Sequence, residues 1–332
     1  MKKLLAILLA MVLVLGMAAC GAKTEEAPAP EVPVEEPAEV VETPAEEPEA
    51  PAEEPTEDGA KFDGDVSKLG PIMKKIYETG VFEAGYTAQK PPQQFHLTVD
   101  GQDTVVGFEV WISDLIAERL SEYFGREVKQ NINIFTVAGG LAALQAEQLD
   151  CMPTLSATPE RKENYDFSQA YHRSLQTVMY LDEREGEACF ELANGLEGVT
   201  VAVQKGSTNE SGLILQYPKC TVLSLEKQSD VLISVLTGKA DACLMNEKTA
   251  ILYCAANPEL MYDLELSYNV DKEKDPGASY CVPKGNEDFV AVIDEVLTEI
   301  IADGRFTQLE KDAIALCDNS EVLAAYMAEN LE

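Results

Sequence analysis

LDCMPTLSATPERKENYDFSQAYHRS, residues 149–174, is the stretch around which the chain is organised. An apolar run ends here and short hydroxyl side chains follow. Thr158 can cap a helix whose first position is Pro159, because a helix leaves that first N–H group unpaired in any case. The stretch therefore predicts a strand, a polar connection and the start of a helix.

Arg161 falls in the first turn of that expected helix, where the helix dipole disfavours a cation. A guanidinium beside the hydroxyl groups of Thr154 and Ser156 would form a clamp for a carboxylate, with a planar two-point donor and additional O–H donors. The alternative is a surface arginine beside capping hydroxyl groups. The stretch alone does not separate these two interpretations.

The same stretch resembles a signature of bacterial extracellular solute-binding proteins for polar amino acids, which serve ATP-driven importers. TPER followed by YDFSQAY carries the resemblance, and further segments match in the family order over roughly residues 72–316. The resemblance implies an α/β fold with two lobes, the type II periplasmic-binding-protein fold, joined by two crossing hinge segments. It also implies that Arg161 grips the carboxylate of a small ligand, and that no cofactor or metal is needed.

The N-terminus has the features of a secretory leader. Lys2 and Lys3 precede an apolar run over residues 4–19, which is short for a membrane span. Its end, MAAC at 17–20, resembles the lipobox of bacterial lipoproteins, which implies a lipidated Cys20 on the extracytoplasmic face of the cell membrane. Two or more acyl chains would give a stable anchor. The alternative is an ordinary cleaved leader with an incidental cysteine.

Residues 23–60 are rich in Glu, Pro, Ala and Val, and hold 14 acidic residues and one lysine. Such a segment cannot bury enough apolar surface to fold, and charge and proline keep it extended. We expect a tether. Most of the net charge of −34 remains on residues 61–332, which argues against nucleic acid and anionic lipid as partners.

Sequence periodicity and turn residues predict alternating strands and helices. The expected helices cover 66–77, 140–148, 228–237, 289–302 and 319–331, and a further helix follows VVGF at 105–108 and ends near residue 124. The expected strands cover 81–86, 131–137, 150–152, 175–181, 198–204, 221–225, 240–245 and 279–282. This alternation predicts a mostly parallel sheet covered on both faces, with ligands beyond the carboxyl ends of its strands. The expected parts are a leader over 1–19, an anchor and tether over 20–60, lobe 1 over 61–181 and 269–332, and lobe 2 over 182–268.

A second candidate anion site lies in KGSTNE, residues 205–210. Ser207 and Glu210 have the spacing of a capping box, and the N–H groups at a helix start can bind an anion. The resemblance implies that Ser207 and Thr208 take the ligand carboxylate from the second lobe. A plain helix cap without a ligand is the alternative.

The sequence departs from the family at three ligand positions. Lys90 stands where the family has an aromatic residue, VAGG at 137–140 lacks another, and Asn246 replaces the aspartate that pairs with the ligand ammonium. Asparagine can accept a hydrogen bond, but without charge. Tyr86, at the end of the first expected strand, is counted among the ligand contacts.

These changes make the expected pocket more positive, and we expect acidic amino acids or small dicarboxylates to bind better than cationic or aromatic amino acids. Alternatively, Lys90 reaches solvent and Glu247 holds an ordinary ammonium. Trp111, where the family has an aspartate, is expected to pack on its helix.

The expected function is a monomeric receptor that serves the permease and ATPase of an ABC importer. A dehydratase-like enzyme with Glu247 as general acid, or a ligand sensor, remain alternatives.

Cysteine and histidine give weak signals. We expect Cys151, Cys243 and Cys281 to be small buried residues, whereas Cys189, Cys220, Cys254 and Cys317 could pair in part. His172 could contact a ligand at the rim of the site or lie solvated on the surface. The sequence has no spacing typical of a metal site.

Overall fold

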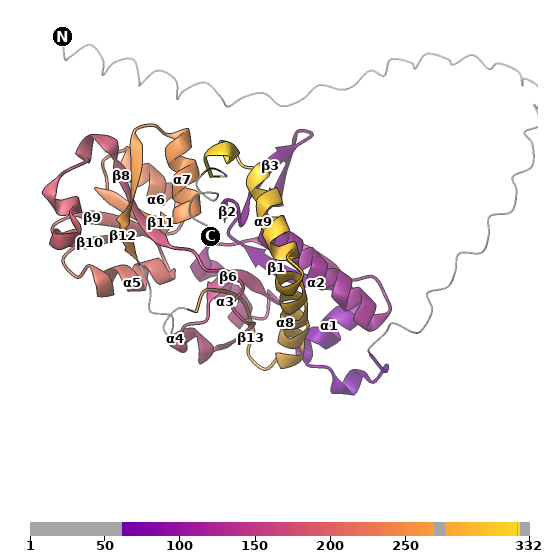
Figure 1. Ribbon diagram of the computed structural model, residues 1–332. Coiled ribbons are helices and arrows are strands. Elements are labelled where there is room, and N and C mark those ends of the chain that lie inside the picture. Colours follow the sequence, from indigo (N-terminus) through magenta and orange to yellow (C-terminus); the bar gives the residue numbers. More distant parts are fainter. Residues whose placement is uncertain (1–61, 269–275, 324, 326–332) are drawn as a thin grey trace, which may run out of the picture. The chain divides into compact units, whose positions relative to one another are not determined.

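The computed structural model describes residues 62–268, 276–323 and 325 (Figure 1). The expected leader, the lipidated cysteine, the tether and most of the helix expected over 319–331 lie outside the described residues. No helix of the described part is both long enough and apolar enough to cross a membrane.

Lobe 1 contains the N-terminal elements and the C-terminal helices. Its elements are η1 (Val66–Lys68), α1 (Pro71–Thr79), β1 (Val81–Tyr86), β2 (Gln89–Lys90), β3 (Gln94–Val99), β4 (Gln102–Val106), α2 (Phe108–Phe124), β5 (Lys129–Ile134), α3 (Val137–Gln145), β6 (Met152–Ser156), α4 (Pro159–Lys162), β7 (Tyr165–Phe167), β13 (Ala278–Pro283), α8 (Glu287–Ala302) and α9 (Arg305–Ala315). Strands β1 and β5 pair in parallel, β13 lies antiparallel between β6 and β7, and β2, β3 and β4 form a separate antiparallel sheet. A bridge between Ala84 and Cys151 links β1 to the start of β6.

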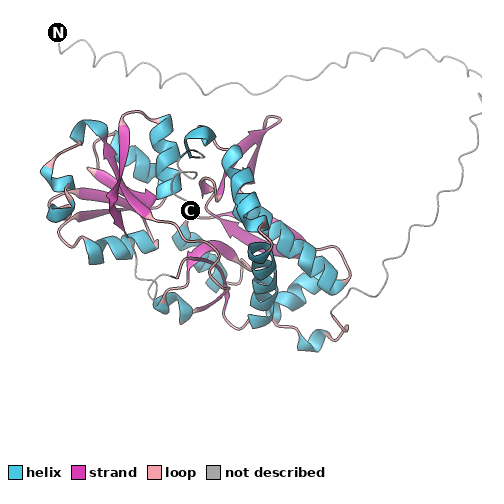
Figure 2. Cartoon of the chain, in the orientation of Figure 1, coloured by secondary structure: helices cyan, strands magenta, loops and turns pink. Residues whose placement is uncertain are grey.

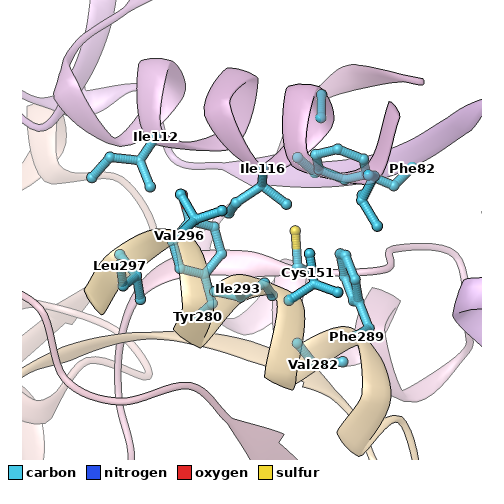
Figure 3. Packing of buried hydrophobic residues seen from close by; sticks show 14 of the residues in the cluster. Phe82, Ile112, Ile116, Cys151, Tyr280, Val282, Phe289, Ile293, Val296 and Leu297 are labelled. Atoms are coloured by element: carbon cyan, nitrogen blue, oxygen red, sulfur yellow. The ribbon is translucent and has the colours of Figure 1, made fainter. Parts of the chain in front are cut away.

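The core of lobe 1 forms between its strands and the helices α2 and α8 (Figure 3). Phe289, Ile293 and Leu297 of α8 recur at a spacing of four residues, so they share the face that meets Cys151 and Tyr280 of the strands. Trp111 packs partly buried against this cluster, as expected. Figure 2 shows these helices beside the strands that they cover.

Lobe 2 is built on one five-stranded sheet with the order β10-β9-β11-β8-β12. Its elements are β8 (Gln176–Leu181), η2 (Asp182–Arg184), η3 (Ala188–Phe190), η4 (Leu192–Asn194), β9 (Thr200–Gln204), α5 (Thr208–Gln216), β10 (Thr221–Leu225), α6 (Gln228–Leu236), β11 (Ala242–Asn246), α7 (Glu247–Ala256) and β12 (Leu260–Tyr268). Two apolar clusters, one with Leu213 of α5 and one with Val231 of α6 and Ala250 of α7, form the core of this lobe.

The strand expected to cross between the lobes belongs to lobe 2. Strand β8 pairs antiparallel with β11 and with β12, so the first segment of lobe 1 ends before Gln176 and not at residue 181. Strand β13 is likewise antiparallel to its neighbours. The prediction of a mostly parallel sheet is therefore wrong for the strands next to the crossings, because these strands enter from the other lobe and not through a covering helix.

Two chain segments cross between the lobes side by side. The N–H group of Tyr171 donates to the carbonyl of Ala278 at 2.9 Å, and the N–H group of Ala278 donates to the carbonyl of His172 at 2.8 Å. The paired residues lie just before the first expected hinge segment, 175–181, and just after the second, 268–277. Residues 269–275, within the second one, lie outside the described part.

Several element bounds differ from the expected ones for local reasons. The helix expected over 66–77 is split, because Gly70 and Pro71 start a new helix, α1. Helix α3 begins at Val137 and not at residue 140, because the side chain of Thr136 caps it by accepting from the N–H group of Gly139. All seven described cysteines are free thiols, so the structure contains none of the disulfides considered.

Candidate functional site

A cavity of about 260 Å³ lies between residues of both lobes and of the crossing segments. This is at the small end of ligand pockets, which commonly measure about 300–1,000 Å³. The loop residues Lys90 and Gln93 and the strand residues Thr154 and Ser156 line it from lobe 1. The residues that line it from the crossings and from lobe 2 are His172, Arg173, Ser174, Leu175, Gln176, Gln204, Ser207, Thr208, Asn209, Gln228, Val231, Leu244, Asn246, Gly277 and Ala278.

Six of the eight expected ligand residues line this cavity: Lys90, Thr154, Ser156, Ser207, Thr208 and Asn246. Tyr86 does not. It is fully buried in the core of lobe 1, where its hydroxyl contacts Ser113 and Gln130 at 2.7 Å each. Its strand position turns the side chain toward α2, which the sequence could not show. Tyr86 is therefore placed away from the cavity.

Arg161 lies next to the cavity lining and connects the two lobes. Its guanidinium donates to the carbonyl of Ser156 at 3.0 Å and to the carbonyl of Gly206 at 2.8 Å. Ser156 belongs to lobe 1, and Gly206 belongs to the loop before α5 of lobe 2. The four-residue helix α4 is capped by Thr158, as expected, and holds Arg161 in this partly buried place. The arginine is not a solvated surface side chain.

Thr154 is anchored to a buried carboxylate beneath the cavity, that of Glu109. The Thr154 hydroxyl donates to Glu109, and Glu109 also accepts from Gln94 at 2.8 Å and from Tyr171 at 2.7 Å. Burial raises the pKa of Glu109 and these hydrogen bonds oppose the rise. Sequence reasoning missed this network, since its members come from distant segments.

The loop that carries Lys90 and Gln93 is fixed by the start of α2. The N–H groups of Phe108 and Glu109 donate to the carbonyls of Pro92 and Gln93. A Cβ at Gly107 would lie 2.2 Å from the carbonyl oxygen of Gln93, and Gly107 has a φ of +129°. Only glycine fits this approach, so the VVGFEV segment positions the loop.

On the lobe 2 side, Ser207 caps α5 as predicted. Its hydroxyl accepts from the N–H group of Glu210 at 3.3 Å and donates to the carbonyl of Gln204 at 2.5 Å. The Glu210 carboxylate accepts from the N–H group of Gly206, one residue before the position of a regular capping box. The Ser207 hydroxyl is used twice, whereas the hydroxyl of Thr208 and the first N–H groups of α5 have no partner within the helix at the cavity edge.

Asn246 ends β11 and caps α7. Its Oδ1 accepts from the N–H group of Lys248 at 3.0 Å. Only an acceptor can face that N–H group, so the orientation of the amide is determined and its Nδ2 group remains for the cavity. The expectation that Asn246 offers an acceptor to a ligand ammonium stays a prediction, since Oδ1 keeps a second lone pair beside its bond to Lys248.

Two cationic or titratable side chains complete the lining. Burial lowers the pKa of Lys90, which makes no hydrogen bond or ion pair with any residue that the structure describes. Burial lowers the pKa of His172 to about 4, so its imidazole is neutral at neutral pH. His172 Nε2 lies 2.7 Å from Ser174 Oγ, at the edge of the cavity and not on the open surface.

Two findings concern residues beyond the expected set. Glu247 is the first residue of α7 and is about 9% exposed, but it does not line the cavity. Gln93 does line it, is 3% exposed, and its Oε1 has no hydrogen-bond partner among the described residues. The available sequence signal was PPQQF at 91–95, a polar loop after the first expected strand.

Comparison with known proteins agrees with this architecture. The chain is 26% identical over 218 residues to the ABC transporter glutamine-binding protein of Bacillus subtilis, covering 65% of this chain and 76% of that one. It resembles an amino acid ABC transporter substrate-binding protein from Streptococcus pneumoniae, bound to L-arginine, with a TM-score of 0.65 and 27% identity over 73% of this chain and 97% of that one. An ancestral amino acid-binding protein, a precursor of cyclohexadienyl dehydratase, shares the fold at 23% identity and a TM-score of 0.60, covering 72% and 97% of the two chains.

The family model described as bacterial extracellular solute-binding proteins, family 3, matches residues 82–314, which is most of the described chain. That range includes both lobes, both crossing segments and all the cavity-lining residues named above. The two-lobed α/β fold and the relatives from amino acid ABC transporters support the same family assignment. The chain belongs to the bacterial extracellular solute-binding proteins, family 3, and is a substrate-binding protein of the amino acid ABC transporter class.

Proposed function

We propose that this protein is the lipid-anchored receptor of an ABC importer and closes its two lobes over a small carboxylate, an acidic amino acid or a small dicarboxylate. One observation carries the proposal: both lobes present donors to one small cavity, and no Asp or Glu of the described chain lines it. Such a lining favours an anion over a cation.

Closure is favoured when a ligand touches both lobes, because contact with one lobe alone does not distinguish open from closed. Arg161 supports this role, since its guanidinium already contacts both lobes. An arginine has five N–H donors in a planar fork, a geometry that suits a ligand carboxylate. Thr208 and the start of α5 would hold the same carboxylate from lobe 2.

The leader and tether extend the proposal to the whole chain. MAAC at 17–20 supports lipidation at Cys20, and the acidic segment over 23–60 supports a flexible connection to the folded part. The permease and ATPase of the importer are the proposed protein partners, and the receptor is proposed to act as a monomer outside the cytoplasmic membrane. We propose no enzymatic role, because Glu247 does not line the cavity.

Replacing Arg161 tests this function. Arg161→Ala should weaken binding of L-glutamate, L-aspartate or succinate at least a hundredfold, because a buried carboxylate loses its charged partner. Titration calorimetry measures the affinity, after a thermal-shift screen has identified which of these probes binds. The matched control is Arg126→Ala, which removes an exposed arginine far from the cavity. Affinity near that of the wild type in Arg161→Ala would contradict the clamp.

A further inference from the structure

We propose that the ligand is a compact dicarboxylate without an ammonium group, and that a hydroxyl group takes the place of the amino group. This inference rests on the proposed function, which leaves acidic amino acids and dicarboxylates both open. The choice between them depends on the polarity of the cavity where the lining residues Lys90, Gln93 and Asn246 come together.

Asn246 contributes donors at this end of the cavity. Its Oδ1 already accepts from the N–H group of Lys248 at 3.0 Å, which fixes the amide orientation and leaves both N–H donors of Nδ2 for a ligand. A carboxylate or hydroxyl oxygen would accept from Nδ2. An ammonium group has no acceptor, so it could use only the remaining lone pair of Oδ1, without a charged partner.

Lys90 adds a positive charge to the same end. The Thr249 hydroxyl donates to the carbonyl of Pro91 at 2.8 Å, which holds the Lys90 loop against the first turn of α7, next to Asn246. A ligand ammonium would meet a like charge in a partly desolvated site, while a second ligand carboxylate would gain an ion pair.

Helices of lobe 2 increase the positive potential. Helices α5, α6 and α7 all begin at cavity residues: Thr208, Gln228 and the capping Asn246. Each N-terminus carries a partial positive charge, and the N–H groups of the first turn of α5 have no partner within the helix. The first turns also carry Glu210, Asp230 and Glu247, which offset this charge, so the helix starts supplement the side chains chiefly through their N–H groups.

Gln93 indicates the group between the two carboxylates. Its buried Oε1 lacks a donor among the described residues, and it lines the cavity. A buried acceptor without a partner costs stability until a donor reaches it. Either a hydroxyl or an ammonium could donate to Gln93, but only the hydroxyl could at the same time accept from Nδ2 of Asn246.

Glu247 does not restore an ammonium site in this arrangement. It begins α7 immediately after Asn246, and its N–H group donates to the carbonyl of Leu175 at 3.0 Å, but its side chain does not reach the cavity lining. The described lining thus combines cations, amides and hydroxyl groups without a carboxylate to pair with an ammonium.

Isosteric probes test the inference directly. L-malate and L-aspartate differ only by a hydroxyl and an ammonium group, and L-2-hydroxyglutarate and L-glutamate form a longer pair of the same kind. Titration calorimetry on the full chain should give an affinity at least tenfold higher for the hydroxy acid of the pair that fits. Tighter binding of the amino acid would overturn the inference and leave the proposed receptor function standing. Binding of none of the four would overturn both.

Asn246→Asp provides the matched change in the protein. Aspartate keeps the cap of α7 and almost the same shape, but replaces the Nδ2 donors by a carboxylate oxygen. The variant should bind the amino acid of each pair more tightly than the hydroxy acid. Its affinity for the hydroxy acid should fall at least tenfold relative to the wild type. Gln102→Glu adds the same charge on the exposed strand β4 and should leave the preference unchanged. An unchanged preference in Asn246→Asp would refute the role of Asn246, and if that variant fails to fold, the wild-type comparison still decides.

Discussion

His172 shows how burial at a single residue becomes a pH dependence. Its ring packs against those of Phe108 and Phe306, which also contact each other, and its charged neighbours are Lys248 and Glu310. Burial lowers its pKa from 6.5 to about 4. Between these values the unfolded chain binds a proton that the folded protein does not, so stability falls as the pH drops from 6.5 to about 4.

We expect His172→Gln to flatten this dependence. The wild type should lose up to roughly 3 kcal/mol of unfolding free energy across this pH window from this residue, and the variant should lose correspondingly less. Denaturant titrations at pH 7, 5.5 and 4.5 measure the difference. His96→Gln, a change at the exposed second histidine on β3, is the control. Parallel pH profiles for wild type and His172→Gln would contradict this explanation.

Individual site residues were predictable where their chemistry is local. The hydroxyl groups of Ser207 and Thr158 cap the helices that the sequence predicted, since a cap depends on residues three positions apart. The roles of Tyr86, Asn246 and Gln93 depend on what distant segments place beside them. Asn246 could be read as a changed ligand residue, but only the cap on α7 shows which end of its amide faces the cavity.

At the scale of elements, α7 belongs to lobe 2 and also packs on lobe 1. Ile251 and Leu252 join an apolar cluster with Phe95 of β3 and Ile314 of α9. Beside this cluster, Lys248 pairs with Glu310 of α9, and both side chains are largely buried, at 7% and 11% exposed. Helix α7 thus also contacts lobe 1 outside the crossing segments.

Breaking that pair on one side should be costly. Glu310→Ala should lower the unfolding free energy by about 3–5 kcal/mol, because Lys248 would remain buried without its partner, and the double variant Lys248→Met with Glu310→Leu should recover most of the loss. Chemical denaturation measures both. Glu197→Ala breaks an exposed pair with Lys219 and should cost at most about 1 kcal/mol. A similarly small loss for Glu310→Ala would mean that the pair is solvated.

Helices and strands could be predicted from the sequence where neighbouring residues determine both where they begin and where they end. Residues 81–86 and 221–225 form strands as expected, and Gly125 ends α2 in a left-handed conformation. Strand β6 instead continues to Ser156, because β13, more than 100 residues later in the chain, pairs with it. The membership of β8 in lobe 2 has the same cause, its pairing with β11 and β12. Such pairings are long-range and leave no local pattern in the sequence.

At the scale of the whole molecule, the charge distribution fits a receptor held near a membrane but not bound to its surface. The net charge of −34 repels anionic lipid headgroups, so the proposed contact with the membrane depends on the lipid at Cys20 and not on surface charge. The segment over 23–60 could reach on the order of 100 Å at roughly 3.1 Å per residue when fully extended. A lipid at Cys20 would then hold the folded part near the importer without restricting its lobes.

Cys20→Ser should therefore move the protein from the membrane fraction to the soluble fraction without changing its ligand affinity, because the tether separates the anchor from the cavity. Fractionation followed by titration calorimetry with the best-binding dicarboxylate or acidic amino acid measures both properties in one preparation. Cys189→Ser, a change at a partly exposed thiol of lobe 2, should stay with the membrane. Stable anchoring takes more than one acyl chain, so loss of the modified cysteine should release nearly all of the protein. If Cys20→Ser still sediments with membranes after a high-salt wash, the anchor lies elsewhere and the lipobox interpretation fails.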